Sequence, residues 1–196
     1  MTNIANNIII VEGANCTGKS TLSQILQLKI KYSLMVKLAP SPNYFEKLNG
    51  NYEKNMYYQT FELIKSVSEN NVILDRYFFS EYVYSQIYKE YTIDYFNELV
   101  NKLDSLNRNI YVILLTTSFE NMLLRINDRK SITNKDEIYG SKNLEIANEY
   151  LKAQKLFIEK FDDIKGINIK KLIYNNDLSI ENAVKTIMEF VYEETK

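Results

Sequence analysis

The chain has 196 residues, a length that fits one α/β domain better than two. With 24 Lys and Arg against 25 Asp and Glu, its net charge of −1 gives no global field favouring nucleic acid or an anionic membrane as a partner. The absence of His and the single cysteine, Cys16, exclude His general bases, His or Cys zinc sites and disulfide bonds. The sequence shows no signal peptide and no apolar segment of membrane-spanning length, so we expect a cytoplasmic protein.

Strands are predicted to alternate with helices along the chain. From the N-terminus, we expect a strand at 7–12, a helix at 20–32, a strand at 33–39, a helix at 52–70 and a strand at 72–75. Further on, we expect helices at 79–89 and 96–106, a strand at 109–116, a helix capped by Ser118, a polar stretch at 127–142, a helix at 143–161, a strand at 170–174 and a helix capped by Ser179. This alternation predicts a five-stranded parallel sheet flanked by helices, with ligands at the carboxyl ends of the strands.

Residues 13–20 read G-A-N-C-T-G-K-S, a complete G-x-x-x-x-G-K-S motif between a predicted strand and a predicted helix. Glycines let such a loop curl so that its amides point at phosphate oxygens, while the lysine reaches the β- and γ-phosphates and the serine hydroxyl binds Mg²⁺. The residues expected to bind the phosphates of ATP are Gly13, Asn15, Cys16, Thr17, Gly18, Lys19, Ser20 and Thr21. The alternative is an ordinary glycine turn. Within the loop, Cys16 is either a small filler or, beside a helix N-terminus, a thiol whose pKa is lowered.

A second motif, D-R-Y-F-F-S-E-Y-V-Y at residues 75–84, lies where the third strand ends. It resembles the thymidylate kinases, which carry D-R-Y-x-x-S-x-x-A-Y there, and more distantly the deoxynucleoside kinases, which carry E-R-S. The resemblance extends from residue 8 to about 181 and implies a three-layer P-loop NTPase fold with a lid. It also implies that Arg76 binds the substrate phosphate and that Asp75 lies near the metal, roles that suit a guanidinium and a carboxylate. A structural ion pair between the two side chains is the alternative.

Arginine occurs only four times, at Arg76, Arg108, Arg125 and Arg129, which suggests that each one does what lysine cannot. Arg125 and Arg129 precede and enter a segment, about 127–142, that looks like the lid of the same kinases. Spaced four residues apart on a helix, they share a face and could converge on the transferring phosphoryl group. Solvated helix charge is the alternative for both, and Arg108 lies in no motif.

The segment Y-Y-Q-T-F at residues 57–61 resembles the F-Q-T-Y segment of deoxynucleoside kinases, in which the Gln pairs with a pyrimidine edge. We therefore assign Gln59, Tyr57 and Phe61 to the substrate base, together with Tyr84 from the second motif. An amide offers a donor and an acceptor side by side, and the rings offer stacking faces. A plain amphipathic helix explains Tyr57 and Phe61 equally well.

Two positions depart from these families. Thymidylate kinases usually have an acid where this loop has Asn15, which leaves recognition of the sugar open. Both families usually carry Glu-Pro after the second strand, where this chain has Ala39-Pro40. In deoxynucleoside kinases that Glu deprotonates the sugar hydroxyl, a step that an acceptor phosphate does not need, so its absence favours a monophosphate acceptor.

The sequence thus predicts one nucleotide kinase domain over residues 1–196, with Mg²⁺ as cofactor and ATP as phosphate donor. The expected reaction transfers the γ-phosphate to dTMP or a related pyrimidine monophosphate. The alternatives are a deoxynucleoside kinase and a non-catalytic nucleotide-binding module. Its partners are then small-molecule nucleotides and, as is common in these families, a second copy of the chain.

Overall fold

The computed structural model describes residues 6–38, 51–88, 93–131 and 140–192. Within these residues five strands form one sheet with the order β2-β3-β1-β4-β5, and every neighbouring pair is parallel. The strands are β1 (Ile8–Glu12), β2 (Ser33–Lys37), β3 (Asn71–Asp75), β4 (Ile110–Thr116) and β5 (Ile169–Asn175). The predicted five-stranded parallel sheet is confirmed.

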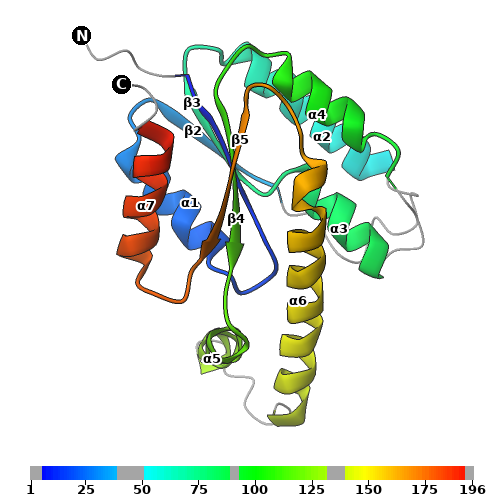
Figure 1. Cartoon of the computed structure of the whole chain (residues 1–196), viewed down its shortest axis with the longest axis vertical. Helices are drawn as coiled ribbons and strands as arrows, with labels where there is room; N and C mark the ends of the chain where they lie inside the picture. Colours follow the sequence, from blue (N-terminus) through cyan, green and yellow to red (C-terminus); the bar gives the residue numbers. More distant parts are fainter. Residues whose placement is uncertain (1–5, 39–50, 89–92, 132–139, 193–196) are drawn as a thin grey trace.

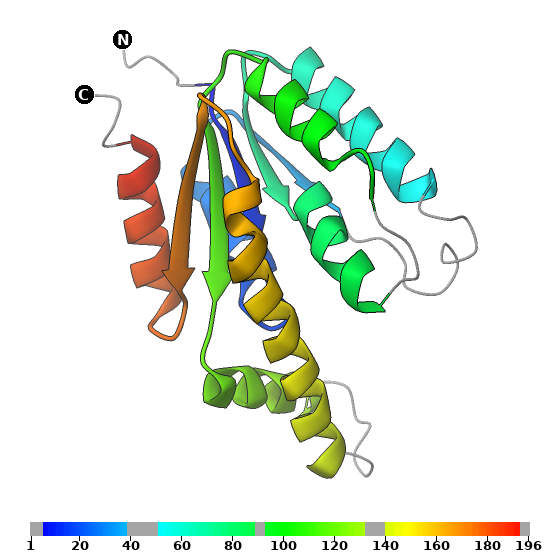
Figure 2. The same cartoon turned by 45° about the vertical axis from the view of Figure 1, so that its right-hand side comes forward.

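Helices cover both faces of this sheet and make a three-layer molecule (Figures 1 and 2). They are α1 (Lys19–Lys29), α2 (Asn51–Ser66), α3 (Phe78–Tyr88), α4 (Phe96–Asp104), α5 (Phe119–Ser131), α6 (Gly140–Lys160) with a 3-10 turn at Phe161–Asp163, and α7 (Ile180–Tyr192). The helices α1 and α7 pack on one face through Leu22, Leu26 and Ile187, while α2, α3, α4 and α6 pack on the other.

The central strands are apolar because both of their faces are covered. All residues of β1, β3 and β4 are buried, whereas the edge strands β2 and β5 are partly exposed. Runs of Ile, Val and Leu suit a strand buried on both faces. The strand β1 lies at the middle of the sheet, with Val11 paired with Asp75 of β3 and Glu12 paired with Leu114 of β4. The loop after β1 therefore starts between the ends of β3 and β4.

The stretch expected to be a polar lid is partly helical. The helix α5 continues to Ser131 and α6 already begins at Gly140, three residues before the expected start, while residues 132–139 lie outside the described part of the chain. The two helices lie side by side (Figures 1 and 2) and share a small apolar cluster that includes Met122, Ile126 and Ala147. Packing between α5 and α6 thus extends helical structure into a segment whose composition reads as a loop.

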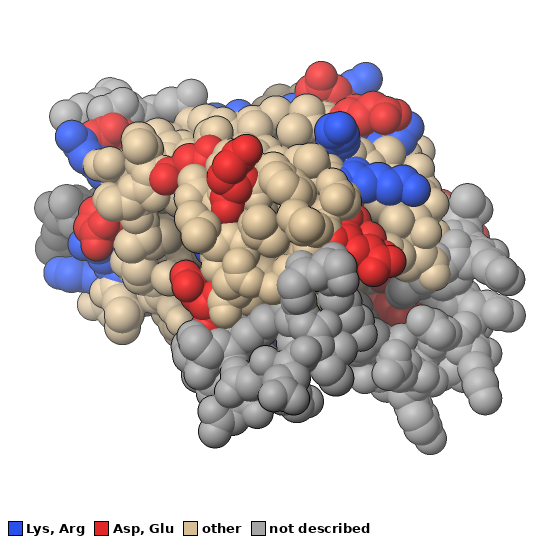
Figure 3. Space-filling view, turned by 90° about the horizontal axis from the view of Figure 1, so that it is seen from below, with Lys and Arg blue, Asp and Glu red and all other residues tan. Residues whose placement is uncertain are grey.

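The surface seen from the carboxyl end of the sheet carries both signs of charge. Acidic and basic side chains are scattered among uncharged residues on the described part of this face (Figure 3). Among the described residues, none of the helices combines the length and the apolar content that crossing a bilayer requires.

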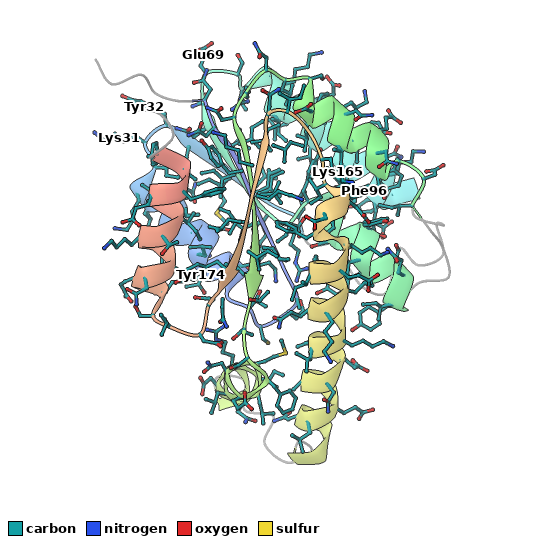
Figure 4. The ribbon with its side chains drawn as sticks, in the orientation of Figure 1. Lys31, Tyr32, Glu69, Phe96, Lys165 and Tyr174 are labelled. Carbon is teal, nitrogen blue, oxygen red and sulfur yellow. The ribbon has the colours of Figure 1, made fainter. Side chains whose placement is uncertain are left out.

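At the other end of the sheet, where Figure 4 labels Lys31, Tyr32 and Glu69, Arg108 joins three chain segments. Its guanidinium donates to the carbonyl oxygens of Asn6 at 3.0 Å, Ile64 at 3.0 Å and Asn70 at 2.5 Å. These carbonyls precede β1, lie in α2 and precede β3. Arg108, the arginine that lies in no motif, therefore has a structural role: it links three chain segments with a geometry that the single ammonium group of a lysine could not reproduce.

We expect Arg108→Lys to lower the free energy of unfolding by about 2 kcal/mol, because at least one charge-assisted hydrogen bond to a carbonyl is lost. Urea denaturation followed by circular dichroism measures the change. Lys29→Arg is the control, because it also exchanges one basic residue for the other, lysine for arginine, but at an exposed position of α1. Equal midpoints and slopes for Arg108→Lys and the unsubstituted chain would contradict the assignment.

Candidate active site

The loop of residues 13–18 joins β1 to α1, the position that a phosphate-binding motif requires. Gly13 and Gly18 have φ angles of 138° and 94°, a region that favours glycine. A Cβ atom on Gly13 would lie 2.3 Å from the carbonyl oxygen of Leu115, and one on Gly18 would lie 2.5 Å from Nδ2 of Asn176. Backbone conformation and space both require glycine at these two positions.

The other loop residues have distinct environments. Thr17 is buried and its hydroxyl donates to the carbonyl oxygen of Ala14 at 2.9 Å. Cys16 has a φ of 64° and packs in the cluster between α5 and α6. Asn15 is partly exposed, and Thr21, on the first turn of α1, is exposed. The loop is thus packed on one side and open on the other.

Lys19, the first residue of α1, is 5% exposed. Its Nζ donates to the carbonyl oxygen of Ala14 and lies 3.4 Å from Oγ1 of Thr17. Burial and the nearby Arg76 guanidinium lower the pKa of this amine well below its ordinary value, although Asp75 and other neighbouring groups raise it. A phosphate anion at the loop would favour the charged form of Lys19.

Ser20 and Asp75 form the candidate metal position. The Ser20 hydroxyl donates to Oδ2 of Asp75 at 2.6 Å, and Asp75 is 1% exposed. Its Oδ1 is buried and receives no hydrogen bond from the described residues. A hydroxyl beside an orphaned carboxylate oxygen fits Mg²⁺, which uses one or two protein oxygens and completes its shell with phosphate and water. The described residues contain no group of three or more His, Cys, Asp or Glu that could hold a metal.

Lys37, at the end of β2, is a cation that the sequence did not single out. It pairs in register with Asp75, and its Nζ lies 3.9 Å from Oδ2 of that carboxylate. Its side chain is 57% exposed, so the ammonium group remains accessible to a ligand. Only the sheet order, which places β2 next to β3, could have revealed this neighbour.

Arg76 follows β3 and has a φ of 73°, a left-handed conformation that is uncommon for a residue with a side chain. This geometry turns the guanidinium towards the phosphate loop, where Nη2 donates to Oδ1 of Asn15 at 2.6 Å. Nη1 donates to the Ser80 hydroxyl at 3.2 Å, and the guanidinium carbon lies 5.5 Å from the centre of the Tyr84 ring. The structure therefore brings three predicted residues together: Arg76, Asn15 and Tyr84.

Glu12, the last residue of β1, links the two motifs. Its Oε1 accepts hydrogen bonds from the backbone N–H groups of Tyr77 at 2.8 Å and Ser80 at 3.3 Å, at the start of α3. Its Oε2 accepts from the Ser80 hydroxyl, which also accepts from Arg76. Glu12 thus fixes Ser80, and Ser80 contacts Arg76. Glu12 lies in neither sequence motif, so the sequence assigned it no role.

The predicted base residues are not brought together. Tyr57 and Phe61 are buried in the core between α2 and the sheet, and Tyr77 donates its hydroxyl proton to the Tyr57 carbonyl. Gln59 is exposed, about 200° around α2 from each of these two residues. Its contact with the base stays a prediction. The sequence already indicated this arrangement, because the spacing of Tyr57, Phe61 and Ile64 places them on one apolar face of a helix and leaves Gln59 off that face.

The structure describes the side chain of only one of the two arginines predicted at the lid. Arg125 lies on α5, and its guanidinium donates to the carbonyl oxygens of Cys16 at 3.1 Å and Asn176 at 2.5 Å. It contacts the phosphate loop through carbonyl groups, and its predicted contact with the migrating phosphoryl group stays a prediction. Arg129 is in the same helix, but its side chain lies outside the described residues, so its role also stays a prediction.

A cavity of about 320 Å³ opens beside the loop, next to Arg125. Its lining residues come from the loop, α1, α5, the segment between β5 and α7, and the start of α7: Cys16, Gly18, Thr21, Arg125, Asp128, Asn176, Leu178 and Ile180. The size suits the nucleoside part of a ligand whose phosphates lie on the loop.

No protein-family model matches the chain. Among curated proteins, the SPbeta prophage-derived uncharacterized protein YorR of Bacillus subtilis (strain 168) is 34% identical over 90 residues. These residues make up 44% of this chain and 47% of YorR, so the match spans about half the length of that relative.

Solved structures match over almost the whole chain. YorR from Bacillus subtilis, crystallised in complex with phosphorylated GDP, has a TM-score of 0.67 at 18% identity, over 96% of this chain and 97% of YorR. Thymidylate kinase from Candida albicans has a TM-score of 0.58 at 17% identity, over 97% and 93% of the two chains. The chain has the fold of the P-loop kinases. Deoxyadenosine kinase from M. mycoides with bound dCTP also matches, with a TM-score of 0.55 at 18% identity over 95% and 99%.

These matches confirm the predicted three-layer P-loop NTPase fold and its likeness to the thymidylate kinase-like group. At identities below one fifth, they show the fold alone and not the reaction, which depends on the residues of the site.

We expect Glu12 to make the stability of the protein depend on pH. Burial raises the pKa of its carboxyl from 4.5 to about 7, although hydrogen bonds from Ser80 and Tyr77 and the charges of Arg76 and Lys19 lower it. The folded protein then keeps this proton to higher pH than the unfolded chain. Stability attributable to Glu12 is present below pH 4.5 and is lost as the pH rises through 7, by about 3 kcal/mol.

The Glu12→Gln variant stays neutral and keeps an acceptor for the N–H groups of α3, so it should lack this loss. Urea denaturation of both proteins at pH 5 and pH 8 measures the difference, and effects of all other titrating groups cancel in the comparison. Parallel pH profiles for the two proteins would show that the Glu12 pKa is not raised.

Proposed function

We propose that this chain is a kinase that transfers the γ-phosphoryl group of Mg·ATP to the phosphate of a deoxynucleoside monophosphate, with dTMP or a related pyrimidine nucleotide as acceptor. The observation that carries the proposal is the position of Arg76. Its guanidinium contacts the phosphate loop, because Nη2 donates a hydrogen bond to Oδ1 of the loop residue Asn15 at 2.6 Å. A loop for one phosphorylated ligand thus faces a planar cation suited to a second.

The donor half of the proposal rests on the loop and its surroundings. Loop amides, the N-terminus of α1 and Lys19 form a positive environment for the β- and γ-phosphates. Ser20 and Asp75 would bind Mg²⁺, which would neutralise charge on those phosphates. The cavity beside Arg125 would take the nucleoside part of ATP.

The acceptor half rests on two cations at the end of β3 and β2. Arg76 can bind two phosphate oxygens at once, and the exposed ammonium group of Lys37 lies beside Asp75 on the same edge of the sheet. An acceptor phosphate bound there would lie next to the end of the donor chain. Holding both reactants in line while cations neutralise the transferring group is sufficient catalysis for phosphoryl transfer.

A deoxynucleoside kinase is the second candidate, favoured by the match to deoxyadenosine kinase. A hydroxyl acceptor needs a base, and the two described carboxylates near Arg76 have other partners. Asp75 faces Ser20 at the proposed metal position, and both oxygens of Glu12 accept hydrogen bonds from Ser80 and Tyr77. Residue 39, an alanine where these families carry Glu, lies outside the described residues. These contacts favour an acceptor that already carries a phosphate. The pyrimidine preference comes from the resemblance alone, since Gln59 is exposed.

The deciding experiment incubates the protein with Mg·ATP and a panel of deoxynucleosides and their monophosphates, and measures ADP. We expect ADP with monophosphates, and highest turnover with dTMP or another pyrimidine nucleotide. ADP with nucleosides alone would establish the second candidate. Binding of ATP without any acceptor-dependent ADP would establish a non-catalytic nucleotide-binding module. Lys19→Ala is the negative control, because it removes the cation at the donor phosphates.

We expect Arg76→Lys to lower kcat/KM for the monophosphate by about 10- to 100-fold, because a bidentate contact becomes a single one. The KM for ATP should change by less than about threefold, since Arg76 lies on the acceptor side. Steady-state kinetics with each substrate varied in turn measures both. An equal loss for ATP and the monophosphate would place Arg76 at the donor instead.

We expect Lys37→Met to raise the KM for the monophosphate by about three- to tenfold, a modest effect because the side chain is largely exposed. Lys29→Met removes the same charge from an exposed position at the far end of α1 and is the matched control. A change in the Mg²⁺ dependence with an unchanged monophosphate KM would show that Lys37 acts on Asp75 rather than on the acceptor.

A further inference from the structure

Two carbonyl groups of the phosphate loop receive hydrogen bonds from side chains far along the sequence. Arg125 Nη1 donates to the carbonyl oxygen of Cys16 at 3.1 Å, and Asn176 Nδ2 donates to the carbonyl oxygen of Thr17 at 2.8 Å. Nη2 of Arg125 also donates to the carbonyl oxygen of Asn176. These two residues therefore form one unit, which we call the Arg125–Asn176 brace.

The brace is itself anchored to the sheet. The backbone N–H of Asn176 donates to the Thr116 carbonyl at the end of β4, at 2.8 Å. The next residue, Asp177, accepts from the Thr117 hydroxyl at 2.7 Å and from the Ser118 N–H at 2.8 Å. Ser118 immediately precedes α5, the helix that carries Arg125. The segment after β5 and the start of α5 are thus fixed to each other before either contacts the loop.

The α6 helix supports the same turn. The Gln154 side chain, 7% exposed, donates to the Thr117 carbonyl and accepts from the Thr117 N–H, both at 2.9 Å. Both backbone groups of Thr117 are therefore satisfied by one amide. Because the turn between β4 and α5 is fixed from two sides, the brace has a rigid base.

Peptide geometry turns these contacts into a constraint on the phosphate-binding groups. In a trans peptide, the C=O of one residue and the N–H of the next point in opposite directions, and the described chain contains no cis bond. Hydrogen bonds to the carbonyls of Cys16 and Thr17 therefore fix the N–H groups of Thr17 and Gly18 on the opposite side of the loop. The left-handed conformation of Cys16 is one that most residues avoid, so contacts from outside the loop are needed to stabilise it.

We propose that Arg125 and Asn176 are positioning residues that orient the Thr17 and Gly18 amides for a polyphosphate before it binds. Amides that are already oriented bind an anion without the cost of reorganising the loop. This inference rests on the polyphosphate-binding part of the proposed function and not on the identity of the acceptor. It also gives Arg125 a role that differs from direct contact with the migrating phosphoryl group.

The Asn176→Asp variant tests the proposal, because it keeps the size of the side chain and replaces its donor with an oxygen. That oxygen would face the Thr17 carbonyl, and the existing Oδ1 already receives no hydrogen bond from the described residues. Asn182→Asp adds the same charge at an exposed position of α7 and is the matched control. Because Asn176 is 3% exposed, Arg125→Met serves as a second variant should Asn176→Asp fail to fold.

Inorganic tripolyphosphate, titrated by calorimetry, is the probe, and folding of each variant is checked by its thermal midpoint without ligand. We expect tripolyphosphate affinity to fall about tenfold or more in the folded variants, and to change by less than about twofold in Asn182→Asp. In turnover, the KM for ATP should rise by a similar factor while the KM for the acceptor stays within about twofold. A general structural defect would affect both substrates.

Tripolyphosphate affinity within about twofold of the unsubstituted chain, in a folded Asn176→Asp or Arg125→Met variant, would overturn the proposal. If the unsubstituted chain binds tripolyphosphate but phosphorylates no monophosphate, the proposed acceptor is wrong. The binding comparison then still decides the role of the brace.

Discussion

The parallel pairing of β1 with both β3 and β4 is the constraint on which the site depends. It places three strand ends side by side, so the phosphate loop leaves β1 between Asp75 of β3 and Thr116 of β4. The first neighbour supplies a carboxylate and a guanidinium, and the second begins the turn that fixes the Arg125–Asn176 brace. Each face of the loop is therefore defined by a different neighbouring strand.

Charge at this edge of the sheet is balanced by local pairs. Asp75 lies between Ser20 and Lys37, while Glu12 is satisfied by α3 amides and Ser80. Lys19 and Arg76 differ from these carboxylates, since within the described residues both cations donate hydrogen bonds to neutral oxygens. An anion with several oxygens would complete the coordination of Lys19 and compensate for its burial.

The sequence predicted the fold and the local motifs because both depend on residues that are close together in the chain. The alternation of apolar strands and helices predicted the parallel sheet. The motifs at residues 13–20 and 75–76 each follow or end an apolar run, so the sequence also predicted that they lie at strand ends. The residues that it missed act across the chain. Glu12 contacts Ser80, and Asn176 contacts Thr17, 159 positions away, through contacts that only the folded sheet creates. The base contact of Gln59 stays a prediction, because it rests on a likeness of five residues, while the helical pattern of apolar residues indicates only that its side chain points outward.

The separation between Thr17 and Asn176 also bears on when the site can form during synthesis. The phosphate loop leaves the ribosome before β5 and the segment that follows β5, since it precedes them along the chain. A nascent chain that ends before Asn176 contains the entire motif and yet lacks one of the donors that align it. Truncated translation products of this protein would then carry the phosphate-loop sequence without the hydrogen bond from Asn176 that we propose orients it.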